Sequence, residues 1–128
     1  FVRATGVDLI VPNLGTEHRT TTTKPLDYRR EIAREIAKRV GPIQALHGTS
    51  SLGGRLGAVG TDGICKINYY TAMARTASAA VRNAWEATPS GETLPIAKAC
   101  GSFLHRTRRD AIAANVASLL RLLETRPK

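Results

Sequence analysis

The sequence predicts an α/β fold in which short parallel strands alternate with helices. Apolar, strand-like runs occupy residues 8–14, 43–46 and 64–68, and a segment with helical apolar spacing lies between the first two. A helical crossover between neighbouring strands makes them parallel, so their carboxyl ends are expected at one edge of the sheet. Functional side chains are therefore expected at that edge.

The first strand–helix–strand unit begins with residues 8–14. This run is continuously apolar in character, as expected for a strand that is covered on both faces. A polar loop follows at residues 20–25, and Asp27 is expected to cap a helix that runs to about Val40. Gly41-Pro42 ends this helix, and the second strand follows directly.

The predicted helix before Val40 is amphipathic. Its apolar positions recur at helical spacing. They are Ile32, Ala33, Ile36, Ala37 and Val40. On the outer face, Glu31 is expected to pair with Arg34, and Glu35 with Lys38 and Arg39.

The second half of the chain is predicted to be mostly helical. Four glycines within residues 51–63 favour a short or distorted helix, because glycine weakens a helix interior. After the strand at 64–68, a long helix is expected from Thr71, with a break at residues 89–91. Its buried side is predicted to contain Ala72, Met73, Ala77, Ala80, Val81 and Ala84. A terminal helix is expected over about residues 95–124, with a kink near Gly101. Its apolar stripe is predicted to include Ile112, Val116, Leu119, Leu120 and Leu123.

Composition limits the possible function classes. The net charge of +9 favours anionic partners, but the basic residues are dispersed and aromatic residues make up only 5%, so nucleic acid is not the expected partner. No apolar run is long enough to span a membrane, and two cysteines do not form a disulfide framework. We therefore expect a cytoplasmic protein. Residues 1–6 read as the last turn of a helix closed by Gly6, which predicts that the chain continues a larger structure.

Two histidines stand at the ends of the first two predicted strands. His18 and His47 are 29 residues apart, on either side of the predicted helix. Two imidazoles at a shared strand edge can bind one metal ion. Each histidine taken alone is also compatible with a hydrogen-bonded structural residue.

Three βα units followed by helices resemble the last part of a (β/α)8 barrel, about strands 6–8, since a complete barrel needs about 200–250 residues. Three motifs in order resemble the class II, zinc-dependent ketose-bisphosphate aldolases, a family that includes fructose- and tagatose-bisphosphate aldolases. They are Gly15-Thr16-Glu17-His18, Leu46-His47-Gly48-Thr49-Ser50, and Gly63-Ile64-Cys65-Lys66-Ile67-Asn68-Tyr69-Tyr70-Thr71. The expected division is residues 1–86 as the last three βα units and 87–128 as a helical extension of the same domain.

The resemblance implies a carbon–carbon lyase of carbohydrate metabolism that cleaves a ketose 1,6-bisphosphate into dihydroxyacetone phosphate and an aldehyde phosphate. It implies zinc as the cofactor, with His18 and His47 as two of three histidine ligands. The substrate-binding residues that it implies are Arg19, Gly48, Thr49, Ser50, Asn68, Tyr69, Tyr70 and Thr71. Asn68 would lie near the reacting carbons, with Ser50 and Thr71 at the phosphate. Lys66 alternates with Asn68, so both are expected to point into the barrel.

The chain departs from the family pattern at several points. It contains no Asp-His-His motif for the first zinc ligand and the catalytic aspartate, so no catalytic residue is assigned, and we expect the isolated chain to be inactive. Arg19 replaces a common glycine, and Ala72 stands where an acidic residue is common. The complete protein is expected to be a homo-oligomer. The alternatives are a non-catalytic sugar-phosphate-binding or interaction domain and, less favoured, a nucleic-acid binder. The sugar bisphosphate itself is left open.

Overall fold

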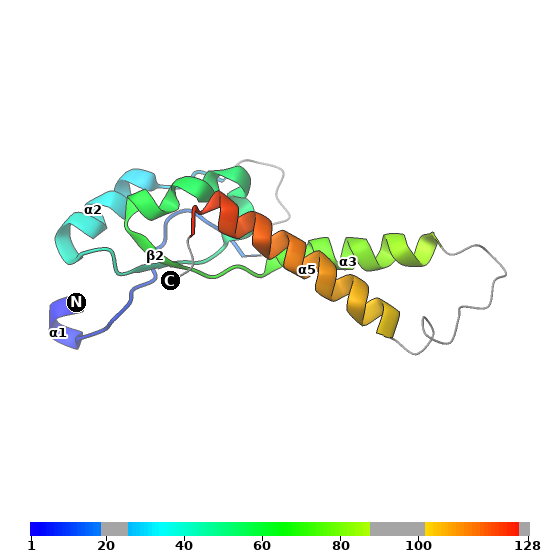
Figure 1. Cartoon of the computed structure of the whole chain (residues 1–128). Helices are drawn as coiled ribbons and strands as arrows, with labels where there is room; N and C mark the ends of the chain where they lie inside the picture. Colours follow the sequence, from blue (N-terminus) through cyan, green and yellow to red (C-terminus); the bar gives the residue numbers. More distant parts are fainter. Residues whose placement is uncertain (19–25, 88–101, 126–128) are drawn as a thin grey trace. The chain divides into compact units, whose positions relative to one another are not determined.

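The structure is a computed structural model that describes residues 1–18, 26–87 and 102–125. Its elements in chain order are helix α1 (Val2–Thr5), helix α2 (Arg30–Val40), strand β1 (Gln44–Leu46), 3₁₀ helices η1 (Thr49–Ser51) and η2 (Gly53–Asp62), strand β2 (Ile64–Ile67), and helices α3 (Thr71–Glu86) and α5 (Ser102–Leu122) (Figure 1). The chain forms two compact units. One contains Phe1–Thr71 and the end of the chain from Leu122, and the other contains Ala72–Arg121.

The first unit contains a parallel pair of strands, β1 and β2. Gln44 lies opposite Ile64 and Leu46 opposite Ile67, with a shift in register after Gln44. Ile10 forms a single parallel bridge to Gln44 on the other side of β1. The predicted parallel α/β arrangement is confirmed, with a sheet shorter than expected.

The predicted strand at residues 8–14 is wrong, because the bridge at Ile10 is its only β pairing among the described residues. The Ile10 N–H donates to Ile43 O (3.0 Å), and the Ala45 N–H donates to Ile10 O (2.8 Å). Pro12 has no N–H with which to continue such a ladder. The expected cover on both faces is also wrong, since Leu9 is 41% and Val11 59% exposed.

The core of the first unit lies between α2, the strands and η2. Figure 1 shows α2 (cyan) near η2 (green), and the two elements are in contact. The buried apolar residues are Leu14, Ala33, Ala45, Leu46, Leu52, Leu56, Val59 and Ile64. This core holds the carboxyl end of β1, where His47 follows.

Helix α2 begins later than predicted. Arg29 takes the N-cap position without a side-chain cap bond, so the prediction that Asp27 caps the helix is wrong. The Arg29 N–H instead donates to Leu14 O (2.9 Å), which holds the chain extended up to that point. Gly41 ends the helix as predicted, with a φ of +85° that favours glycine.

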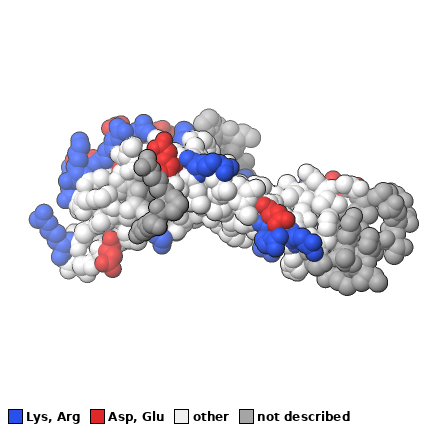
Figure 2. All heavy atoms as spheres, viewed as in Figure 1, with Lys and Arg blue, Asp and Glu red and all other residues white. Residues whose placement is uncertain are grey.

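The two faces of α2 are close to the prediction. Ala33 is fully buried, whereas Ile32, placed on the same stripe, is 43% exposed. The outer ion pairs are confirmed: Arg34 lies 3.7 Å from Glu31, and Glu35 lies 3.9 Å from Lys38 and 3.1 Å from Arg39. Figure 2 shows Lys and Arg side chains along α2 interspersed with acidic ones.

The glycine-rich segment forms the distorted helix that the sequence predicts, as η1 and η2. Gly63, which ends η2, has a φ of +88°. A Cβ there would overlap the Cβ of Ala37 and lie 3.1 Å from the Gln44 amide nitrogen. A glycine at position 63 therefore allows η2 to approach α2 and β1 closely.

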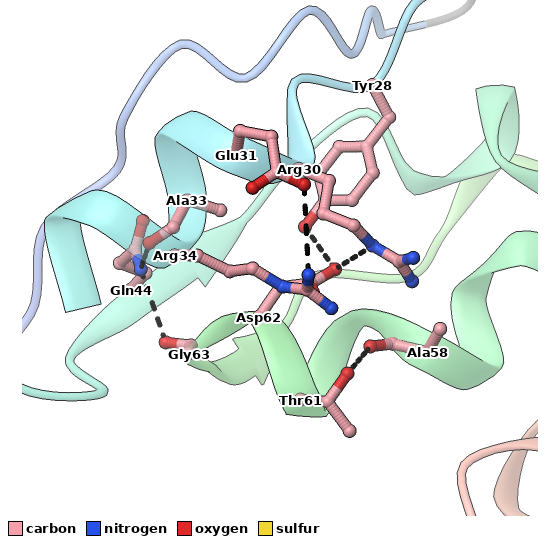
Figure 3. A network of polar contacts seen from close by, with 10 residues as sticks. All are labelled: Tyr28, Arg30, Glu31, Ala33, Arg34, Gln44, Ala58, Thr61, Asp62 and Gly63. Atoms are coloured by element: carbon pink, nitrogen blue, oxygen red, sulfur yellow. Dashed lines mark hydrogen bonds and ion pairs between the residues drawn. The ribbon is translucent and has the colours of Figure 1, made fainter. Parts of the chain in front are cut away.

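Asp62 joins η2 to α2 through a buried carboxylate that the sequence did not indicate (Figure 3). Its side chain is fully buried and accepts hydrogen bonds from Arg34 Nε (2.8 Å), Arg30 Nε (3.1 Å) and the Tyr28 hydroxyl (3.3 Å). Arg30 and Arg34 are four residues apart and so lie on the same face of α2. Arg34 thus serves Asp62 as well as its predicted partner, Glu31.

Burial raises the pKa of Tyr28 to about 12, and the negative charge of Asp62 and its hydrogen bond act in the same direction, while Arg30 and Arg34 act against them. An unfolded tyrosine ionises near pH 10, so the unfolded state releases its proton first as the pH rises. We expect the stability that Tyr28 contributes to be complete below pH 10 and lost as the pH rises through about 12. Tyrosinate absorbance should show one tyrosine ionising near pH 12. Tyr28→Phe should remove that phase from the titration, and a phase that persists in this variant would contradict the assignment.

The second unit contains most of α3 and α5. Helix α3 begins at Thr71 as predicted, and of its expected buried side, Ala77 is fully buried while the other positions are half-buried. Asn115 Nδ2 donates to Thr76 Oγ1 (3.4 Å), which links the two helices. On α5, the predicted apolar stripe is half-buried except for Leu120, which is 46% exposed. The predicted break at 89–91, the start of the terminal helix and the kink near Gly101 lie outside the described residues.

Within the described ranges, no helix combines the length and apolar character that a membrane span requires.

Candidate metal and substrate site

The structure brings His18 and His47 together. His47 directly follows β1, and His18 lies in the exposed segment after the Ile10 bridge. His47 Nδ1 and His18 Nε2 are 3.2 Å apart, and the rings meet edge to face at 64° with centroids 5.2 Å apart. The two imidazoles thus point ring nitrogens at each other from segments that are distant in sequence.

Backbone packing explains why the two segments meet. Gly48 has a φ of +64°, and a Cβ there would lie 2.7–2.8 Å from the main-chain atoms of Glu17. The Thr16 hydroxyl donates to the main-chain carbonyl of His47 (2.7 Å). A close glycine contact and a hydroxyl bond therefore hold the segment before His18 against the turn after His47.

Asn68 adds a third side chain to this group. Its Nδ2 lies 2.5 Å from His47 Nε2, on the opposite side of the ring from His18. The Asn68 main chain is fixed at both ends, because its N–H donates to Leu46 O (3.0 Å) and its carbonyl accepts from the Thr49 hydroxyl (2.9 Å). His18, His47 and Asn68 therefore form a continuous polar row at the carboxyl ends of the strands.

The other predicted substrate-binding residues lie in two groups. Gly48 and Thr49 are buried, with the Thr49 hydroxyl committed to Asn68, and Ser50 is half-buried in η1. Tyr69 and Thr71 are half-buried and Tyr70 is 65% exposed; all three follow β2. Lys66 is exposed on β2. Arg19 lies outside the described residues.

The histidine pair fits a metal ion as two of its ligands. Zinc binds histidine nitrogens at about 2.0–2.1 Å in a tetrahedral arrangement, which places two such nitrogens roughly 3.3–3.4 Å apart. The observed separation of 3.2 Å is close to this value. In the part of the chain that the structure describes, no three His, Cys, Asp or Glu side chains are grouped to hold a metal, so a third protein ligand is not found there.

A family model described as "Fructose-bisphosphate aldolase class-II" matches residues 1–128, the whole chain. The chain belongs to this family. The resemblance read from its motifs is thereby confirmed at the level of the family. Class-II aldolases adopt the (β/α)8 barrel and are generally zinc-dependent lyases of carbohydrate metabolism that bind sugar phosphates. The small parallel sheet and the mixed helix–strand content of this class-II aldolase chain are consistent with a part of such a barrel.

Reasoning from the sequence missed two contacts of this aldolase site. The first is the Thr16 hydroxyl bond to His47, and the second is the Thr49 bond to Asn68. Both threonines stand two residues from a predicted metal ligand, which is the only signal that the sequence offers. Hydroxyl bonds to main-chain carbonyls leave no periodic pattern in a sequence.

Proposed function

We propose that this chain is the C-terminal portion of a zinc-dependent class-II aldolase that cleaves a ketose 1,6-bisphosphate. In this proposal, residues 1–86 supply the last three βα units, about strands 6–8 of the barrel, and residues 87–128 form a helical extension of the same domain. The single observation that carries the proposal is the pairing of His47 Nδ1 with His18 Nε2 at 3.2 Å, in a chain of this family. Earlier strands of a longer protein would supply the remaining zinc ligand and the proton-transfer carboxylate.

His18 and His47 would hold the zinc ion through the two nitrogens that face each other. When bound, zinc supplies a Lewis acid that polarises the substrate carbonyl. Each imidazole must then carry its remaining proton on the other ring nitrogen. For His47 this is Nε2, which faces Asn68.

Asn68 would orient the His47 ring in the metal-loaded protein. A metal ligand of this kind usually donates its second N–H to an oxygen. The Asn68 amide can meet this need by turning its Oδ1 toward His47 Nε2, since the two ends of the amide have the same shape. The same side chain would then lie between the metal ligand and the bound sugar, as its proposed place near the reacting carbons requires.

Substrate phosphate would be held by Ser50 and Thr71, with Gly48, Thr49, Tyr69 and Tyr70 around them. The start of α3 at Thr71 supports this assignment, because N–H groups at a helix start favour anions. Of the threonine and serine after His47, Ser50 is the better candidate for phosphate, since the Thr49 hydroxyl already serves Asn68. Arg19 would add a positive charge next to His18.

A non-catalytic sugar-phosphate-binding or interaction domain is the second candidate. The position after Thr71 favours it, because Ala72 stands where an acidic residue is common in the family. The absence of a three-residue metal cluster among the described residues is also compatible with it. This candidate predicts sugar-phosphate binding without turnover in the complete protein.

The test uses the complete natural protein, with its intact mass measured first, because a full barrel requires about 200–250 residues. We expect cleavage of fructose or tagatose 1,6-bisphosphate to fall about 100-fold or more after removal of metal by a chelator, because Lewis-acid stabilisation is worth several kcal/mol. One equivalent of Zn²⁺ should restore it. Cleavage that withstands complete metal removal would refute the zinc mechanism, and binding without cleavage by the zinc-loaded protein would favour the second candidate. Light scattering would test the expected homo-oligomer, and cell fractionation the expected cytoplasmic location.

A further inference from the structure

We propose that Thr16 is a positioning residue that sets the separation of the His18 and His47 nitrogens. The proposal rests on the function proposed above, and it concerns a residue that would touch neither metal nor substrate. The Thr16 hydroxyl donates to the main-chain carbonyl of His47 at 2.7 Å, and Thr16 is itself only two residues before His18. One side chain thus ties the backbone of one ligand to the segment that carries the other.

The local structure makes this bond important. His18 is exposed, and the segment that carries it has no strand pairing beyond the Ile10 bridge among the described residues. After Pro12, no ladder of main-chain bonds can hold the segment against β1. The Thr16 hydroxyl therefore takes the place of a further rung in that ladder.

Gly48 provides the matching contact on the other side. Its positive φ turns the chain directly after His47, and the lack of a Cβ lets the Glu17 main chain lie against it. Glu17 is the residue between Thr16 and His18. The Thr16 bond and the Gly48 contact together leave the backbone before His18 little freedom to move away from His47.

The test compares Thr16→Val, which removes the hydroxyl and keeps the branched shape, with Thr16→Ser, which keeps the hydroxyl. Thr61→Val is the matched control, because the Thr61 hydroxyl donates to Ala58 O at the same 2.7 Å within η2 and serves neither histidine. Affinities for Zn²⁺ and the visible absorption of Co²⁺ would be measured on the complete natural protein. These readouts report on ligand geometry and not on turnover.

We expect Thr16→Val to weaken Zn²⁺ binding about tenfold, at the lower end of the effect of losing an outer partner of a metal ligand, and to shift the Co²⁺ bands. Thr16→Ser should bind like the unmodified protein, and so should Thr61→Val. Unchanged metal binding in Thr16→Val would overturn the inference and leave the proposed function intact. So would equal weakening in Thr61→Val, or a failure of Thr16→Ser to retain affinity. An unmodified protein that binds neither Zn²⁺ nor Co²⁺ would overturn the proposed function and the inference with it.

Discussion

Replacing His47 by alanine is expected to weaken zinc binding by more than the roughly 10–100-fold that follows loss of an outer partner of a ligand. His47 would be a direct ligand, and it lies between His18 and Asn68, so its removal separates the whole polar row. Aldol cleavage by the complete protein should fall with the bound zinc. His18→Ala should act in the same direction. The measurements are zinc content after dialysis and the rate of cleavage.

His105→Ala is the control for this experiment. It removes the chain's third histidine, which is exposed on α5 in the second unit. We expect it to leave zinc content and cleavage unchanged. Retention of zinc and activity in both His18→Ala and His47→Ala would exclude these residues as ligands.

Replacing Asp62 by alanine is expected to destabilise the first unit by about 3 kcal/mol, the lower end of the cost of breaking a buried ion pair. The carboxylate is fully buried, but Arg30 and Arg34 are 42% and 41% exposed, so water can solvate them in part once Asp62 is gone. Asp62→Asn keeps the shape and removes the charge, so it separates electrostatic loss from lost packing. Urea unfolding of the complete protein gives the change in the free energy of unfolding.

Glu31→Gln provides a matched comparison, because Glu31 pairs with the same Arg34 at the surface. The Glu31 side chain is 85% exposed and lies 3.7 Å from Arg34. A surface pair of this kind contributes about 0–1 kcal/mol, so the variant should unfold nearly like the unmodified protein. An Asp62→Asn variant no less stable than Glu31→Gln would contradict the role assigned to the buried carboxylate.

Local sequence signals predicted much of the fold correctly. Gly41 ends α2, Thr71 begins α3, and the glycines after Ser51 distort the helix at η2. These features depend on neighbouring residues, because helix ends and glycine backbone angles are set within one or two turns. The same kind of signal failed at residues 8–14, where apolar character suggested a strand and Pro12 interrupts the pairing.

The candidate site was predicted in its residues but not in its joints. The motifs with His18 and His47 indicated the aldolase family, and the family match over residues 1–128 agrees. The close approach of Gly48 to Glu17 and the bond from Thr16 to His47 could not be predicted, since each joins segments about 30 residues apart. Contacts at that separation depend on how the chain packs as a whole.

The sequence by itself determined the family, the order of the helices and the pair of histidines, because motifs and periodic spacing are local properties. Only the tertiary structure decided which groups meet. Burial made Asp62 the partner of Arg30 and Arg34, and chain packing aimed His18 and His47 at each other. The physical reason is that a buried charge or an unpaired ring nitrogen is stabilised by the partners that the folded chain brings within reach, however distant they are in sequence.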